Sequence, residues 1–177
     1  MNSMAPVRSA PESLPDIATP ALILDRSRLE ANARRMRGKV ERLGVTLRPH
    51  VKTSKSIDVL RVLGGGTAQV PVTVSTLAEA RYFFAHGVTD ILYAVGIAPV
   101  KLPQVADLLA TGCTLRVILD TLDAAQAVQA FGQANGICIE ALIEIDSDGR
   151  RAGVAPDDDL LVAIARALSA GPGARLA

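Results

Sequence analysis

The feature that most constrains this chain is a regular alternation of short apolar runs with segments of helical spacing. The apolar runs recur about every 20 to 27 residues, and a helical pattern separates most successive runs. Strict alternation of strand and helix favours a parallel sheet with right-handed crossovers. The runs are apolar nearly throughout, which is typical of parallel strands that are buried on both faces.

The pattern gives a definite set of expected elements. Strands are expected over residues 19–24, 47–52, 69–74, 90–95, 114–119, 137–145 and 174–177. Helices are expected over 27–43, 57–63, 76–86, 102–109, 124–131 and 160–168, with capping boxes at Ser27/Glu30 and Thr76/Glu79. A closed barrel of eight strand–helix units needs about 250 residues. The sequence therefore predicts an α/β fold that is the first five to six units of a (β/α)₈ barrel of the TIM type.

Composition sets limits on function. The 177 residues carry a net charge of +1 and are 49% hydrophobic, which fits one sizeable core. Few aromatic residues and near-neutral charge argue against a nucleic-acid surface. The two cysteines form no metal-binding pair and suit a reducing compartment, and no apolar run is long enough to cross a membrane. We expect a cytoplasmic protein with a disordered leader over 1–18 and one barrel-type domain over 19–177.

The segment Leu47-Arg48-Pro49-His50-Val51-Lys52 holds the main candidate for chemistry. In an extended strand Arg48, His50 and Lys52 share one face. Cations close to a lysine disfavour its protonated form, and only a neutral amine attacks a carbonyl. Lys52 is therefore a candidate for carrying an aldehyde cofactor. Alternatively, Lys52 is a solvated loop residue after a strand.

Further polar residues follow the expected strands. Asp25, Asp120, Asp146 and Arg151, like Lys52, come after apolar runs, and the carboxyl ends of parallel barrel strands are where active sites lie. Asp25 and Asp120 have the alternative role of capping helices. The run Gly64–Gly66 closes a helix and lacks the spacing of a phosphate-binding loop, so it is interpreted as a turn.

Four stretches resemble the D-threonine aldolase and D-serine dehydratase group, which are pyridoxal-phosphate enzymes of the alanine racemase fold type. The stretches are Thr19-Pro20-Ala21-Leu22, Arg48-Pro49-His50-Val51-Lys52-Thr53, Asp90-Ile91-Leu92-Tyr93-Ala94 and the loop from Glu144 to Val154. The resemblance runs from about Thr19 to the last residue. It implies that Lys52 forms the internal aldimine, that His50 is the motif histidine beside it, and that Arg151 is the loop arginine near the cofactor and substrate. Position 150, often histidine in such loops, is arginine here and receives no role.

The resemblance also shows departures. Enzymes of this group are considerably longer: their later barrel strands bind much of the cofactor phosphate, and a following β-domain carries metal ligands that nothing in this sequence matches. The chain thus resembles an N-terminal fragment or a truncated product. We expect the N-terminal portion of a pyridoxal-phosphate-dependent D-amino-acid lyase, an aldolase or dehydratase acting on a small D-amino acid. It would need no nucleic acid or membrane partner, and a homodimer is possible. The alternatives are a protein that binds pyridoxal phosphate without turnover, and an inactive fragment.

Overall fold

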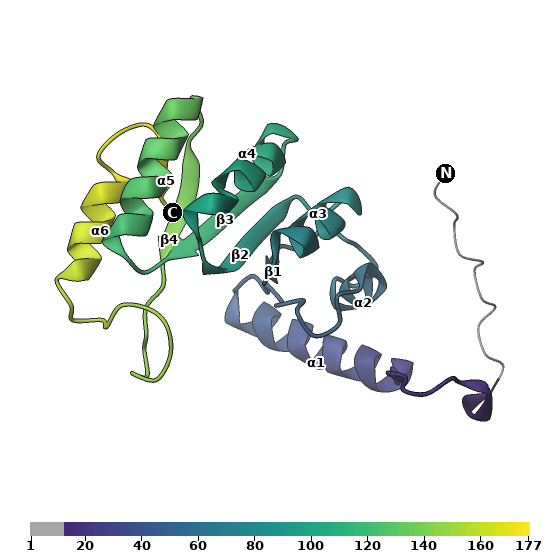
Figure 1. Ribbon diagram of the computed structural model, residues 1–177. Helices are drawn as coiled ribbons and strands as arrows, with labels where there is room; N and C mark the ends of the chain where they lie inside the picture. The colour runs from purple at the N-terminus through teal and green to yellow at the C-terminus, as the bar shows by residue number, and fades with distance from the viewer. Residues whose placement is uncertain (1–12) are drawn as a thin grey trace, which may run out of the picture.

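The computed structural model describes residues 13–177 (Figure 1). Its five strands form one sheet in the order β1-β2-β3-β4-β5, and every neighbouring pair is parallel. The strands are β1 (Val72–Val74), β2 (Asp90–Gly96), β3 (Thr114–Leu119), β4 (Ile139–Ile143) and β5 (Ala174–Leu176). The α-helices are α1 (Arg26–Leu43), α2 (Ile57–Leu63), α3 (Leu77–Ala85), α4 (Leu102–Ala110), α5 (Leu122–Asn135) and α6 (Leu160–Leu168). Sequential parallel order with helical crossovers confirms the partial barrel, whose sheet is not closed.

Helices cover one face of the sheet. In Figure 1, α3 to α6 lie on the same side of the strands. Alternate strand residues such as Ile91, Tyr93, Leu115 and Val117 point to that side and are fully buried. Phe83 of α3 is likewise fully buried and belongs to the same core. Burial of this apolar surface is the main force that stabilises the fold.

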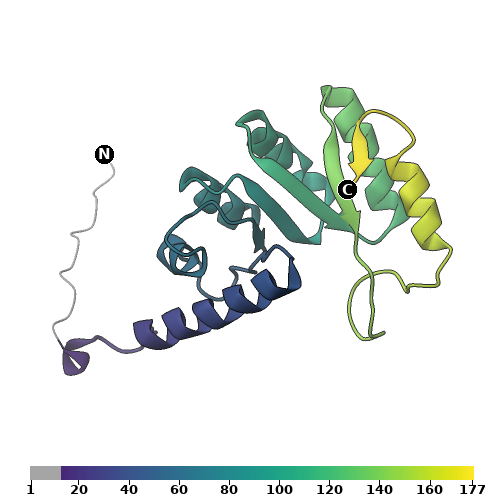
Figure 2. The ribbon, with the colours of Figure 1, turned by 180° about the vertical axis from the view of Figure 1, so that it is seen from behind.

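The opposite face of the sheet is half-exposed (Figure 2). The expectation of strands buried on both faces was therefore wrong, because the curved sheet does not close on itself to cover its inner face. This face carries a row of alternating charges, here called the charge ladder: Arg48, Asp90, Arg116, Glu140 and Arg175. Asp90 accepts hydrogen bonds from Arg48 and Arg116, both at 2.8 Å, and Glu140 pairs with Arg116 at 2.8 Å and with Arg175.

Two expected strands do not form as strands. Residues 21–25 have no regular structure, and Leu22, Ile23 and Leu24 are exposed. A first barrel strand is held by pairing with its neighbouring strands, and within residues 13–177 no strand or bridge pairs with residues 19–24. Residues 47–52 contribute a single parallel bridge, between His50 and Thr73, with hydrogen bonds from Val51 N to Thr73 O and from Thr73 N to Pro49 O.

The helix starts follow their capping chemistry with one correction. Thr76 caps α3 as expected, with its hydroxyl accepting from Glu79 N. The α1 cap is Asp25 rather than Ser27, because its carboxylate accepts from Arg28 N while Ser27 lies inside the helix.

Only part of the expected leader can be compared with the structure. Residues 1–12 lie outside the described residues, and Leu14–Asp16 forms a short 3₁₀ turn. Over residues 13–177, no helix combines the length and apolar character that a bilayer crossing requires.

Candidate functional site

The carboxyl ends of the parallel strands meet along one edge of the sheet, and the candidate residues follow these ends. Lys52 follows the bridge at His50, Asp120 follows β3, and Arg151 lies in the long loop after β4. Figure 1 shows this loop extending from the end of β4. The topology thus brings residues that are distant in the sequence to one side of the molecule.

Lys52 is the second residue of a four-residue turn, 51–54, between the bridge and α2. Its side chain is exposed, and no salt bridge or side-chain hydrogen bond involves its amine among residues 13–177. The preceding residue, Val51, is 2% exposed and anchors the turn in the core. A buried anchor next to an accessible primary amine is an arrangement from which lysine can react with a carbonyl.

His50 lies directly against the Lys52 backbone. Its Nδ1 atom accepts a hydrogen bond from Lys52 N at 3.4 Å, which requires Nδ1 to be unprotonated. Partial burial lowers the pKa of His50 below its usual 6.5, and the nearby Lys52 charge lowers it further, against smaller effects of Glu79 and the Thr73 backbone. The geometry and the lowered pKa both favour a neutral imidazole beside Lys52.

Arg48 departs from the role that the sequence suggested. It was expected to crowd Lys52 together with His50, but its guanidinium pairs with the Asp90 carboxylate at 2.8 Å and also reaches the backbone oxygen of Val72. With Arg48 neutralised and His50 favouring its neutral form, the structure does not show three unpaired cations around Lys52. Arg48 instead ties the segment before Lys52 to β2.

The loop that carries Arg151 folds around the carboxylate of Asp146, and its two ends pair at the base. Asp146 accepts hydrogen bonds from Gly149 N and Arg151 N, both at 3.1 Å. The Arg151 hydrogen bond lowers the pKa of the Asp146 carboxyl against the opposing effect of burial. A parallel bridge between Ile145 and Val154 closes the base of the loop.

Asp120 connects the end of β3 to this loop. Its carboxylate accepts from Gly153 N at 3.2 Å, while the α5 cap is Thr121, so the alternative that Asp120 caps a helix was wrong. Gly153 has a φ of 117°, and a Cβ there would lie 2.6 Å from Asp146 N. Only glycine fits this point without displacing the loop.

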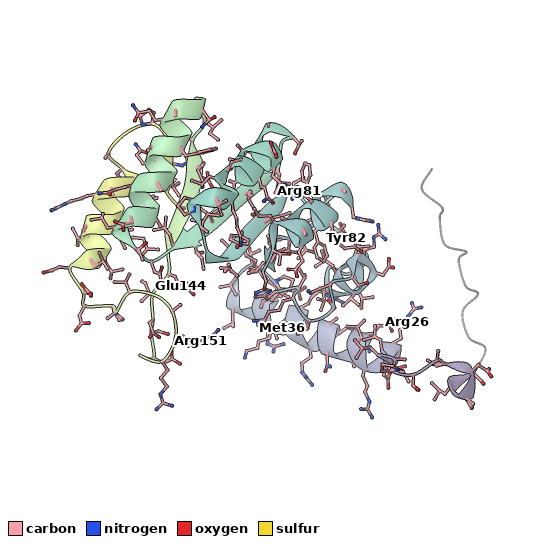
Figure 3. All side chains as sticks on the ribbon, viewed as in Figure 1. Arg26, Met36, Arg81, Tyr82, Glu144 and Arg151 are labelled. Atoms are coloured by element: carbon pink, nitrogen blue, oxygen red, sulfur yellow. The ribbon has the colours of Figure 1, made fainter. Side chains whose placement is uncertain are left out.

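Some of the candidate residues contact one another in the structure, and others do not. His50 and Lys52 are in direct contact, whereas no hydrogen bond or ion pair within the described part of the chain links Arg151 to either. Figure 3 shows Glu144 at the base of the loop and Arg151 further out along it. Three contacts near Lys52, made by Lys55, Glu79 and Tyr82, were not expected from the sequence. The Thr76/Glu79 capping box was the one signal that pointed to any of them.

A metal site is not formed by these residues. Within residues 13–177, no group of three or more histidine, cysteine, aspartate or glutamate side chains is arranged to hold a metal ion.

Comparison with known proteins gives consistent matches. D-threo-3-hydroxyaspartate dehydratase from Delftia sp. (strain HT23) is 49% identical over 166 residues, which cover 93% of this chain and 43% of the relative. D-threonine aldolase from Arthrobacter sp. is 33% identical over 178 residues, which cover 99% of this chain and 46% of the relative. D-serine dehydratase from Schizosaccharomyces pombe is 28% identical over 158 residues, which cover 85% of this chain and 38% of the relative.

Solved structures agree with these matches. The Delftia dehydratase structure superposes with a TM-score of 0.85 at 50% identity, covering 90% of this chain and 42% of that chain. The chain therefore spans less than half the length of the relatives that it matches. Residues 24–177 match the family model described as "Alanine racemase, N-terminal domain". On its sequence match, its parallel strand order and the resemblance in its lysine segment, the chain belongs to the alanine racemase N-terminal domain family.

Proposed function

We propose that this chain is the N-terminal portion of a pyridoxal-phosphate-dependent D-amino-acid lyase, with Lys52 as the point of cofactor attachment. The observation that carries the proposal is the position of Lys52. It is an accessible amine at the carboxyl edge of the parallel sheet, next to the unprotonated nitrogen of His50. The relatives that act as dehydratases and aldolases support the reaction class.

The residues fit the aldehyde end of pyridoxal phosphate. The Lys52 amine can condense with an aldehyde with loss of water, and its side chain has no competing carboxylate partner among residues 13–177. His50 would border the cofactor ring, and Arg151 would approach from the β4 loop. Most of the phosphate site is expected on later barrel strands, which lie outside the matched part of the relatives.

When bound, pyridoxal phosphate supplies an electron sink for bonds at Cα of an amino acid. The chain's own residues would hold it and move protons. Lys52 would hold the cofactor aldehyde and would serve as a base for a proton at Cα or at the β-hydroxyl. The neutral His50 would keep the Lys52 backbone in place through Nδ1. The substrate class supported by the relatives is a small D-amino acid with a β-hydroxyl, cleaved by an aldolase or dehydrated.

The test is uptake of pyridoxal phosphate by the purified chain. The wild type should become yellow, the colour should be bleached by borohydride, and Lys52→Ala should stay colourless. Lys39→Ala, which removes an exposed lysine from α1, is the matched control and should behave as the wild type does. A folded wild type that remains colourless at saturating cofactor would refute attachment by this chain.

Turnover separates the proposal from its alternatives. A loaded chain that cleaves or dehydrates D-threonine, D-serine or D-threo-3-hydroxyaspartate in the presence of a divalent metal supports a lyase. A loaded chain that is inert toward all three favours binding without turnover, which is compatible with a chain that spans 43% of the Delftia enzyme. A cytoplasmic location and a homodimer stay predictions.

A further inference from the structure

The turn between Lys52 and α2 contains an unusual backbone conformation. Lys55 is the one non-glycine residue among 13–177 with a positive φ, at 47°. This left-handed region is disfavoured for residues with a Cβ and persists where surrounding contacts enforce it. Lys55 N donates to Val51 O at 2.9 Å, so the unusual residue closes the turn that begins at Val51 and contains Lys52.

The side chain of Lys55 is held by a buried carboxylate. Its Nζ lies 3.1 Å from Glu79 Oε1, and Glu79 is 8% exposed. Glu79 Oε2 accepts from Ser75 N at 2.8 Å. Burial alone raises the pKa of Glu79, but the hydrogen bonds from Ser75 and Lys55 outweigh it and lower the pKa overall. A buried carboxylate needs a counter-charge, and Lys55 supplies it.

A second contact from the same helix reaches the far end of the turn. Tyr82 lies three residues after Glu79 on α3, which puts the two side chains on one helix face. Its hydroxyl accepts a hydrogen bond from Ile57 N, the first residue of α2, at 3.2 Å. Figure 3 labels Tyr82 on α3 beside α2. Helix α3 thus contacts Lys55, which closes the turn, and Ile57, which begins α2.

We infer that Glu79 is a positioning residue for Lys52. Its carboxylate fixes Lys55 in the left-handed conformation, and that conformation sets the path of the turn from which the Lys52 amine projects. This inference rests on the proposed attachment of pyridoxal phosphate to Lys52. A helix-capping role alone would require only that Glu79 offer an oxygen to Ser75 N, which an amide also offers.

Glu79→Gln separates the two roles, because glutamine keeps the oxygen and the volume but loses the charge that pairs with Lys55. Asp58→Asn is the matched control, since it removes an exposed carboxylate from neighbouring α2. Hydrogen exchange is measured on the full chain without cofactor. Glu79→Gln should raise exchange at the amides of Lys55 and Ile57 about tenfold, the factor expected for losing one charged hydrogen bond. Asp58→Asn should leave both amides unchanged.

Cofactor loading gives the second readout. Glu79→Gln should weaken pyridoxal phosphate uptake about tenfold and should alter the visible circular dichroism of the cofactor band at saturation. A loss of global stability alone would not change that band among folded molecules. Failure of the wild type to load would refute the proposed function. Loading, circular dichroism and exchange equal to the wild type in Glu79→Gln would refute the positioning role alone.

A variant of Lys55, the exposed partner of Glu79, tests the same inference if Glu79→Gln does not fold. Lys55→Gln removes the same ion pair from a side chain that is 61% exposed. It should reproduce the faster exchange at Ile57 and the weaker loading. A folded Lys55→Gln that matches the wild type in both measurements would overturn the inference.

Discussion

Replacing Asp90 by asparagine tests how the Lys52 segment is attached to the sheet. Within residues 13–177, the segment 47–52 has one backbone bridge, at His50, and Asp90 adds a second attachment by pairing with Arg48. The same carboxylate pairs with Arg116, so Asp90→Asn leaves two guanidinium groups facing a neutral amide.

The size of the effect follows from burial. A buried ion pair that loses one partner costs about 3–5 kcal/mol, whereas an exposed pair contributes about 0–1 kcal/mol. The Arg48 and Arg116 side chains are 27% and 28% exposed and Asp90 is 37% exposed, which places this pair between the two limits. Arg116 also keeps its partner Glu140. We expect a loss of about 1.5 kcal/mol in the free energy of unfolding, or about 5 °C in Tm.

The assay is urea and thermal denaturation of the wild type, Asp90→Asn and Asp58→Asn at low and high salt. The control removes an ion pair whose carboxylate is 83% exposed, so it should cost at most about 0.5 kcal/mol. Asp90→Asn should also increase hydrogen exchange over residues 47–52. If Asp90→Asn proves no less stable than Asp58→Asn, the charge ladder does not attach the Lys52 segment to the sheet.

Three further outcomes are expected. Burial raises the pKa of the Cys113 thiol to about 11, while Cys138 is exposed, so a thiol reagent at pH 8 should label Cys138 quickly and Cys113 only after unfolding. Burial lowers the pKa of His50 in the folded chain, so the unfolded chain takes up the proton first as the pH falls. The stability that neutral His50 contributes is full above pH 6.5 and is lost as the pH falls through the lowered folded pKa. Unfolding free energies from pH 5 to 8 should therefore fall more steeply toward acid in the wild type than in His50→Gln, and equal slopes would contradict this. Gly153→Ala should displace the Arg151 loop, seen as faster tryptic cleavage at Arg150 and Arg151 with little change in Tm.

Local patterns in the sequence predicted much of the fold. The strand at Thr114–Leu119 and the helices at Ile57–Leu63 and Leu160–Leu168 match the expected residues. In these segments the apolar spacing and the flanking turn residues favour the same element that tertiary packing requires. The strand expected at 19–24 does not form, because a strand depends on hydrogen bonds to neighbouring strands. The residues of one segment do not show whether such neighbouring strands are available.

The site was predictable only in part. Lys52 and His50 were candidates because their spacing in one short segment is visible in the sequence, and the structure shows a hydrogen bond from Lys52 N to His50 Nδ1. The neutralisation of Arg48 by Asp90 joins residues 42 positions apart, and no local pattern shows it. The contact between Glu79 and Lys55 was hidden for the same reason, since the capping box accounted for Glu79 by itself.

The proposed function depends on attachment of pyridoxal phosphate to the ε-amine of Lys52. Borohydride reduction of the chain after incubation with pyridoxal phosphate, followed by peptide mapping, tests it directly. We expect a stable adduct on Lys52 and none on Lys55, whose amine is engaged by Glu79. An adduct spread over exposed lysines such as Lys39, or no adduct on Lys52 in the folded chain, would contradict attachment at Lys52.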